Sequence, residues 1–240
     1  MAVFLLVHGA WHGGWCWAEL EKQLHSLGHQ THAPTLTGPG ERSHLAHPDI
    51  NADSHVTDVV NTIKWRELHD VILVGHSYGG MVITGVAEQI PQKIRSLVYL
   101  DAVVPEQSGI SLFAKANPDR VAGFEKQLEH GGFTIEPDLF DAWTDDPVRK
   151  DWLKRMCTPH PVRCFREGVT LTGKEQQVKD RLYILAERNQ PSAFWAEYDK
   201  VNGRPGWTCQ RIATKHDVMV EQPAELAGIL HDYINPLEER

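Results

Sequence analysis

Short apolar runs alternate with segments of helical periodicity along the first half of the chain. The run at residues 71–74 contains no polar residue and is bounded by Asp70 and Gly75, a pattern typical of a strand buried on both faces. Strands that alternate with helices in this way predict a parallel sheet with right-handed crossovers. The predicted strands are 3–7, 30–33, 71–74 and 94–100, and the predicted helices are 17–27, a segment capped by Asp53 or Ser54 that runs to about Arg66, and 81–90.

The alternation stops between about residues 104 and 180 and then resumes. This stretch is rich in Pro, Trp, Phe and charged residues, with helix-like pieces at 119–130 and 138–156. We therefore expect a single α/β domain over 1–240, with an insertion at about 104–180 that forms a helical cap over the carboxyl edge of the sheet. Strands are then predicted at 181–186 and 209–213, and helices at 192–200 and 221–233.

Composition and charge narrow the class of protein. The 240 residues are 41% apolar and 23% charged, which is ordinary for a soluble globular protein. The net charge of -8 disfavours nucleic acid or an anionic membrane as a partner, because both attract clustered Lys and Arg. We see no signal-peptide pattern and no apolar run of membrane-spanning length, so we expect a cytoplasmic protein. A homodimer stays open.

The cysteines favour no metal centre. Cys157 and Cys164 flank His160, but this spacing matches no common zinc pattern. We expect these two residues, Cys16 and Cys209 to be free thiols, and we expect neither a metal nor a cofactor.

The segment Gly75-His76-Ser77-Tyr78-Gly79 matches the pattern G-x-S-x-G. The pattern alone is common, but here it lies between a predicted strand and a predicted helix, which is the setting of a nucleophile elbow. Glycines allow the sharp turn that lifts the serine hydroxyl above the sheet. We therefore predict that Ser77 is a catalytic nucleophile.

Acyl transfer also needs two N–H groups directed at the developing oxyanion. The loop after the first strand contains small residues, which let a backbone N–H approach the substrate. We assign one donor to Ala10 in this loop and the other to Tyr78, which follows the nucleophile. His8 and His12 lie in the same loop, and we expect them to brace it through hydrogen bonds.

His216 is the predicted general base. It follows the last predicted strand and precedes the last helix, so it can lean over the sheet edge toward Ser77. A carboxylate is then needed to hold the imidazole in one tautomer. Asn189 stands in the loop where an aspartate is expected, and an amide supplies no negative charge. We favour Asp101, at the carboxyl end of the strand after the elbow, with Glu187 as the alternative and other arrangements open.

Two long motifs make the chain similar to the α/β-hydrolase superfamily over essentially its whole length. The segments 7–15 (VHGAWHGGW) and 75–81 (GHSYGGM) resemble those of the plant methylesterase and hydroxynitrile lyase branch and its bacterial esterase relatives. The resemblance implies hydrolysis of carboxylic esters without a metal or organic cofactor, with Ala10 and Tyr78 donating to the oxyanion. Some members of the superfamily, including a fungal lactonase, place the acid after the strand that follows the elbow, which suits Asp101.

The chain also departs from the lyases of that branch. Those lyases place a threonine at the position of Gly9 and a lysine at the position of Asp217, so cyanohydrin cleavage is disfavoured. We expect a serine hydrolase that cleaves a small, partly apolar ester through an acyl-enzyme. A lactonase, a cofactor-free lyase or oxygenase, and a ligand receptor with this fold are the alternatives. Six aromatic residues of the cap are candidates for the pocket lining, and we expect at least half of them only to pack the cap onto the sheet: Phe113, Phe124, Phe133, Phe140, Trp143 and Trp152.

Overall fold

A six-stranded sheet in the order β2-β1-β3-β4-β7-β8 forms the centre of the protein, and every neighbouring pair in it is parallel. The structure is a computed structural model and describes residues 1–238, with the side chains of residues 1–235. The predicted parallel α/β architecture is confirmed. The strands of this sheet are β1 (Val3–Val7), β2 (Gln30–His32), β3 (Val71–His76), β4 (Ile94–Leu100), β7 (Asp180–Ala186) and β8 (Trp207–Ile212).

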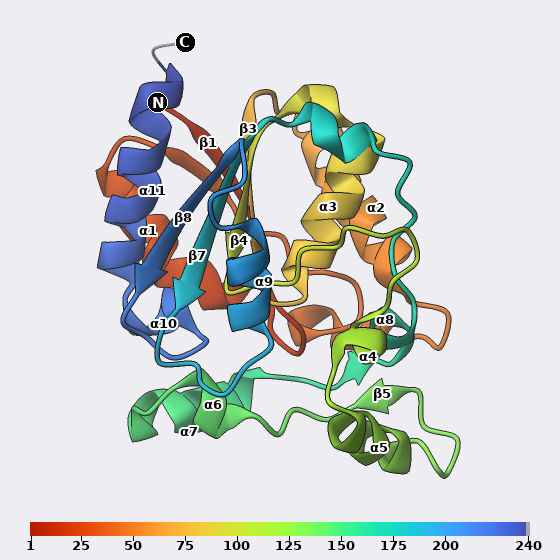
Figure 1. Ribbon diagram of the computed structural model, residues 1–240. Helices are drawn as coiled ribbons and strands as arrows, with labels where there is room; N and C mark the ends of the chain where they lie inside the picture. Colours follow the sequence, from red (N-terminus) through yellow and green to blue (C-terminus); the bar gives the residue numbers. More distant parts are fainter. Residues whose placement is uncertain (239–240) are drawn as a thin grey trace.

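Helices cover both faces of the sheet, so its strands alternate between two apolar cores (Figure 1). On one face, Leu5 and Leu73 pack with α2 and α3. On the other, Phe4 and Ile72 pack with α1 and α11. Burial on both sides explains why β1 and β3 are apolar at successive positions. The covering helices are α1 (Ala18–Ser26), α2 (Ala52–Trp65), α3 (Gly79–Gln89), α9 (Phe194–Val201), α10 (Val218–Glu221) and α11 (Pro223–Glu238).

The segment from α4 to α8 (residues 112–166), called the cap segment below, lies across the carboxyl ends of the strands (Figure 1). It contains short helices and an antiparallel pair of two-residue strands. Its position places it over the end of the sheet at which parallel α/β folds bind ligands. Its elements are α4 (Leu112–Lys115), α5 (Pro118–Gln127), β5 (Thr134–Ile135), α6 (Phe140–Trp143), α7 (Pro147–Met156), β6 (His160–Pro161) and α8 (Arg163–Arg166).

Several helix boundaries differ from those predicted, and each difference has a local cause. Asn51 caps α2, rather than Asp53 or Ser54, because its side chain accepts the Ser54 N–H in a reciprocal capping box. The helix predicted at 138–156 is divided into α6 and α7, and the second piece begins at Pro147. Proline lacks a backbone N–H and is tolerated only in the first turn of a helix. Pro223 likewise begins α11 after the short α10.

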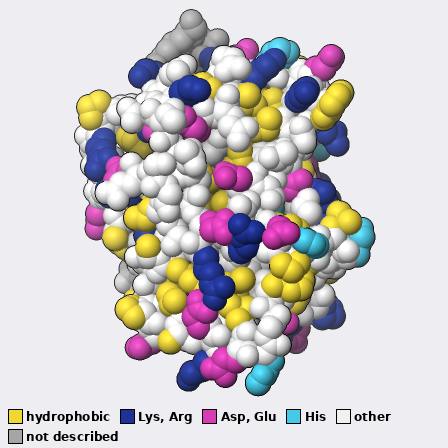
Figure 2. Space-filling view, turned by 90° about the vertical axis from the view of Figure 1, so that its right-hand side faces the viewer, with side chains coloured by type: hydrophobic (Ala, Val, Ile, Leu, Met, Phe, Trp, Pro, Cys, Tyr) yellow, Lys and Arg dark blue, Asp and Glu magenta, His cyan; other side chains and the backbone are white. Residues whose placement is uncertain are grey.

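Basic and acidic side chains lie beside one another on the face of the protein seen in Figure 2. On α8, Arg163 pairs with Asp49 and with Glu167, and Arg166 pairs with Glu125 of α5. Exposed pairs of this kind add little stability each. None of the helices within residues 1–238 has the length and apolar character required to span a membrane.

Candidate active site

Ser77 lies in a sharp turn between β3 and α3, with a backbone φ of 55° that non-glycine residues rarely adopt. The turn is too crowded for side chains at its glycines. A Cβ atom on Gly75 would lie 2.5 Å from the Gly79 carbonyl oxygen, and one on Gly79 would lie 2.7 Å from that of Val7. The strand, the strained serine and the helix therefore have the arrangement predicted for a nucleophile elbow.

Ala10 and Tyr78 line the same pocket as Ser77. The loop that holds Ala10 is braced by His8, whose Nδ1–H donates to the Gly9 carbonyl (2.8 Å) and whose Nε2 accepts the Leu36 N–H (3.0 Å). Burial lowers the pKa of His8 to about 3, so this imidazole is neutral and its two nitrogens play opposite roles. Tyr78 begins the turn into α3, whose N-terminal dipole favours negative charge nearby.

His216 lies beyond the end of β8 and also lines the pocket. Its Nδ1 atom is 2.6 Å from Oδ2 of Asp101. Its ring stacks on Phe194 with the centroids 4.9 Å apart and the planes at 8°. The ring of His76 lies against it with the centroids 4.4 Å apart, and its Nε2–H donates to the His216 carbonyl at 3.0 Å. The orientation of this imidazole is therefore fixed on several sides.

Asp101 directly follows β4, is fully buried and has a φ of 42°. Its Oδ1 accepts the N–H of Ala186 at 3.2 Å, and its Oδ2 accepts the side-chain amide of Asn189 at 2.7 Å as well as the His216 Nδ1–H. Glu187, the alternative acid, pairs with Arg211 at 3.8 Å, and its side chain is 41% exposed. The structure thus places Asp101, and not Glu187, against the imidazole.

Asn189 is a neighbour of both Asp101 and His216. Its Nδ2 atom lies 3.3 Å from His216 Nδ1. A carboxylate only accepts hydrogen bonds, so both nitrogens donate to the Asp101 oxygen and neither donates to the other. The sequence shows that Asn189 lacks a charge, whereas its donation to the acid becomes visible only in the structure.

A second histidine–carboxylate pair lies beside the first. Nδ1 of His12 is 2.8 Å from the Ala10 carbonyl oxygen, and its Nε2 is 3.1 Å from Oδ2 of Asp217. Burial acts to lower the pKa of His12, but the Asp217 carboxylate outweighs it and the pKa is raised. The resulting ion pair joins the Ala10 loop to the residue that follows His216. The sequence predicts the bracing role of His12 but not this partner.

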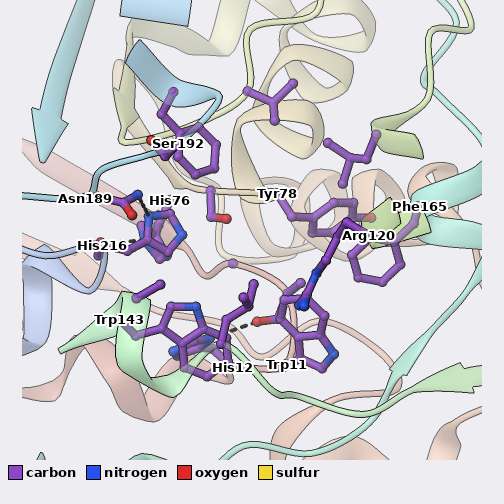
Figure 3. Close-up of a pocket in the computed structure, with 18 of the residues that line it drawn as sticks. Trp11, His12, His76, Tyr78, Arg120, Trp143, Phe165, Asn189, Ser192 and His216 are labelled. Atoms are coloured by element: carbon purple, nitrogen blue, oxygen red, sulfur yellow. Dashed lines mark hydrogen bonds between the residues drawn. The ribbon is translucent and has the colours of Figure 1, made fainter. Parts of the chain in front are cut away.

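The pocket encloses about 260 Å³ and is mainly apolar (Figure 3). Of the six candidate aromatics of the cap, Phe124 and Trp143 line it. Phe113 and Phe140 pack behind these two, with ring centroids 5.9 Å from Phe124 and 4.9 Å from Trp143. Phe133 and Trp152 are not part of the lining. The aromatic residues that the sequence interpretation missed are Trp11, Phe165 and Phe194.

Arg120 of α5 brings a guanidinium group to this lining. Its guanidinium lies 4.4 Å from the centre of the Phe124 ring and forms an ion pair with Asp138. Figure 3 shows Arg120, Tyr78 and Phe165 on one side of the pocket and Asn189 and His216 on the other. The pocket thus has two chemically different sides that meet at the elbow.

The chain is similar to known proteins in both sequence and fold. A model of the alpha/beta hydrolase family matches residues 4–229. A carbendazim hydrolyzing esterase from Nocardioides sp. (strain SG-4G) is 45% identical over 238 residues, which cover 95% of this chain and 97% of the relative. Methylesterase 1 of Arabidopsis thaliana is 33% identical over 105 residues, which cover 43% of this chain and 40% of the relative. An extracellular alpha/beta-hydrolase from a Paenibacillus species has the same fold, with a TM-score of 0.85, 23% identity and coverage of 97% of this chain and 99% of the other.

Proposed function

Since this chain belongs to the alpha/beta hydrolase family and is an esterase-type enzyme, we propose that it hydrolyses a small, partly apolar carboxylic ester through an acyl-enzyme on Ser77. The resemblance expected from the sequence, including that to plant methylesterases, is confirmed by these relatives. The serine mechanism and the substrate are the proposal.

The hydrogen bond between Asp101 and His216 carries this proposal. It occupies Nδ1 of the imidazole with a proton donated to the carboxylate. Nε2 is then the unprotonated nitrogen and is available to accept the proton of Ser77, which lines the same pocket. The buried carboxylate would also stabilise the imidazolium that forms when this proton arrives.

The reaction follows in two stages. Ser77 Oγ attacks the ester carbonyl and loses its proton to His216, while the N–H groups of Ala10 and Tyr78 receive the oxyanion. The tetrahedral intermediate then expels the alcohol, which takes the proton from His216. A water molecule attacks the acyl-enzyme with the help of the same base, and the acid is released.

The two sides of the pocket suggest how a substrate lies. The leaving alcohol must take a proton from His216, so it belongs on the side that holds Asn189 and Phe194. The acyl group then extends toward Phe165 and Phe124, whose rings favour a flat aromatic or alkyl group. A cavity of this size fits a compact substrate.

A substrate screen with matched variants tests the proposal. The panel contains p-nitrophenyl esters of increasing chain length, methyl esters of aromatic acids, lactones, and carbendazim, for which the 45% identical relative is named. We expect wild type to release a burst of p-nitrophenol equal to the enzyme concentration, and Ser77→Ala to release none. Ser192→Ala removes another serine of the same pocket and should keep the burst, whatever its effect on KM.

The same screen separates the alternatives. Preference for lactones over open esters would replace the esterase by a lactonase that uses the same groups. Turnover that survives Ser77→Ala would contradict the acyl-enzyme and favour lyase or oxygenase chemistry based on His216.

A further inference from the structure

A cluster of potential metal ligands lies beside the active site, at the junction of the cap segment and the central domain. It consists of His55 from α2, His160 from β6 and Cys164 from α8. One ligand atom of each lies within 4.8 Å of the others, and all three residues are fully buried. Among the side chains of residues 1–235, no other group of three such ligands is brought together in this way. Cys157, which also flanks His160 in the sequence, is not a member.

Hydrogen bonds orient His55 as they orient many metal-binding histidines. Its Nε2–H donates to the Thr37 carbonyl at 2.8 Å. Its Nδ1 therefore presents a lone pair, which lies 2.9 Å from the Tyr78 hydroxyl and 3.7 Å from the Cys164 sulfur. Donation of the remote N–H to a carbonyl is the usual way in which proteins fix the tautomer of a metal ligand.

His160 has an unsatisfied nitrogen at this site. Its Nδ1 accepts the Trp11 N–H at a long 3.3 Å, and its Nε2 has no hydrogen-bond partner although the residue is fully buried. Buried polar atoms are nearly always paired, so an orphan atom in such a place calls for a partner that the protein chain does not supply. The other groups around His160 are the rings of His55, Tyr78 and Phe165.

We propose that His55, His160 and Cys164 bind a soft monovalent metal ion, Cu(I), in a three-coordinate site. Two imidazoles and a thiolate are the ligands that Cu(I) and Zn(II) accept. The thiolate neutralises a single positive charge, whereas Zn(II) would leave a net charge buried among apolar groups, which is costly. Phe165 and Ile50 lie against the cluster. The carboxylates of Asp58 and Glu167 act on His55 and Cys164 by charge, but they already pair with Arg42 and Arg163, so they leave no net negative charge for a second positive charge on the metal.

Binding of Cu(I) requires neither an oxidant nor a reductant, because the metal and its ligands keep their oxidation states. The Cys164 thiol releases its proton to solvent as the metal–sulfur bond forms, and both imidazoles remain neutral. His160 moves its proton from Nε2 to Nδ1, which ends the bond from Trp11 N–H. The metal replaces the Tyr78 hydroxyl at Nδ1 of His55, and that hydroxyl also neighbours Cys164.

Occupation of the site would affect the active site. Two of the hydrogen bonds that metal binding ends hold Tyr78, whose N–H is a proposed oxyanion donor, and Trp11, which follows the other donor, Ala10. We therefore expect Cu(I) to inhibit ester hydrolysis. This consequence rests on the proposed function, whereas the binding itself does not.

Metal binding is tested on the whole protein under anaerobic conditions, with Cu(I) supplied as its bicinchoninate complex. We expect one Cu(I) per chain to be withdrawn from the chelator, and X-ray absorption to show both nitrogen and sulfur ligands. Cys164→Ser should abolish this uptake, and His160→Gln should weaken it by about 10-fold or more. Cys209→Ser removes a partly exposed thiol elsewhere and should bind as wild type does.

Cu(I) uptake and ester hydrolysis are measured separately, so the metal site can fail without the esterase activity, and the reverse. Ser77→Ala should bind Cu(I) with unchanged affinity even though it hydrolyses nothing. Circular dichroism and the Tm establish that each variant is folded. If Cys164→Ser does not fold, His160→Gln alone tests the site. Equal uptake by wild type, Cys164→Ser and His160→Gln, or no uptake by wild type, would overturn the site.

Discussion

Nδ1 of His216 lies 2.6 Å from Oδ2 of Asp101, although the two residues are 115 positions apart in the chain. β4 ends just before Asp101, and the loop after β8 holds His216. β7 lies between these two strands in the sheet, and its last residue, Ala186, donates its N–H to the other oxygen of Asp101. A carboxylate at the end of one strand therefore reaches across a neighbouring strand end to the imidazole.

Asp101→Asn should lower kcat by about 10⁴-fold, because an amide neither holds the imidazole in the required tautomer nor stabilises its charged form. Steady-state kinetics on a p-nitrophenyl ester measures this. Glu187→Gln is the matched control, since it neutralises the other candidate carboxylate, and its kcat should stay within about 2-fold of wild type. A large loss in Glu187→Gln and a small one in Asp101→Asn would reverse the assignment of the acid.

Exchanging the acid and its neighbouring amide should restore part of the lost activity. Both Asp101 and Asn189 lie within hydrogen-bonding reach of His216 Nδ1. The double variant Asp101→Asn/Asn189→Asp keeps one carboxylate and one amide there, so we expect its kcat to exceed that of Asp101→Asn by about 10-fold or more. A double variant no faster than Asp101→Asn would show that the position of Asn189 cannot support the base.

Asn189→Asp alone should alter the pH dependence of catalysis. It would place two carboxylates around one imidazole, and like charges in close contact raise the pKa of a carboxyl group. The acid limb of kcat/KM should therefore shift to higher pH relative to wild type, as a pH–rate profile would record. An unchanged profile would mean that the new carboxylate points away from Asp101 and His216.

The His12–Asp217 ion pair should stabilise the fold at low pH and lose this effect as the pH rises. The pKa of His12 is raised above its ordinary 6.5, so its stabilisation is complete below pH 6.5 and disappears as the pH passes its folded-state pKa. Urea unfolding of wild type and His12→Gln from pH 6 to 9 should give a gap that narrows with rising pH. His44→Gln, at an exposed histidine, is the control and should give a difference from wild type that does not change with pH. A difference for His12→Gln that widens with rising pH would contradict the ion pair.

Neutral buried histidines should make the protein sensitive to acid. Burial lowers the pKa of His8 to about 3, so below pH 6.5 the unfolded chain takes up a proton that the folded chain refuses. From pH 6.5 to 5.5 this histidine alone should reduce the free energy of unfolding by about 1 kcal/mol. The fall should be smaller by that amount in His8→Gln; an equal fall in both proteins would show that His8 is protonated in the folded state.

The central fold is predictable from the sequence because its signals are local. The strands predicted at 3–7 and 94–100 have the bounds of β1 and β4. Burial on both faces leaves an uninterrupted apolar run in β1, and in β4 an apolar run that follows Arg95 and Ser96. The nucleophile turn is predictable for the same reason, because its glycines and Ser77 are contiguous. The helix predicted at 138–156 is interrupted at residues 144–146, because Pro147 can begin a helix but cannot continue one, although the periodicity runs through it.

The rest of the site depends on contacts between segments that are distant in sequence. Phe165 and Phe194 line the pocket because the cap segment and the start of α9 fold back over the sheet, which no periodicity reveals. Asp217 pairs with a histidine 205 positions away. The spacing of Cys157, His160 and Cys164 gives no metal pattern, whereas the fold adds His55 to two of them.

The most direct test of the account is to find the acyl group. Wild type is mixed with a p-nitrophenyl ester whose bulky acyl group slows deacylation, quenched in acid and mapped by mass spectrometry of its peptides. We predict a single acyl group on the peptide that contains Ser77, attached to that serine, and none in Ser77→Ala. Turnover of the ester with no acyl group on Ser77, or with the group on another residue, would contradict the mechanism.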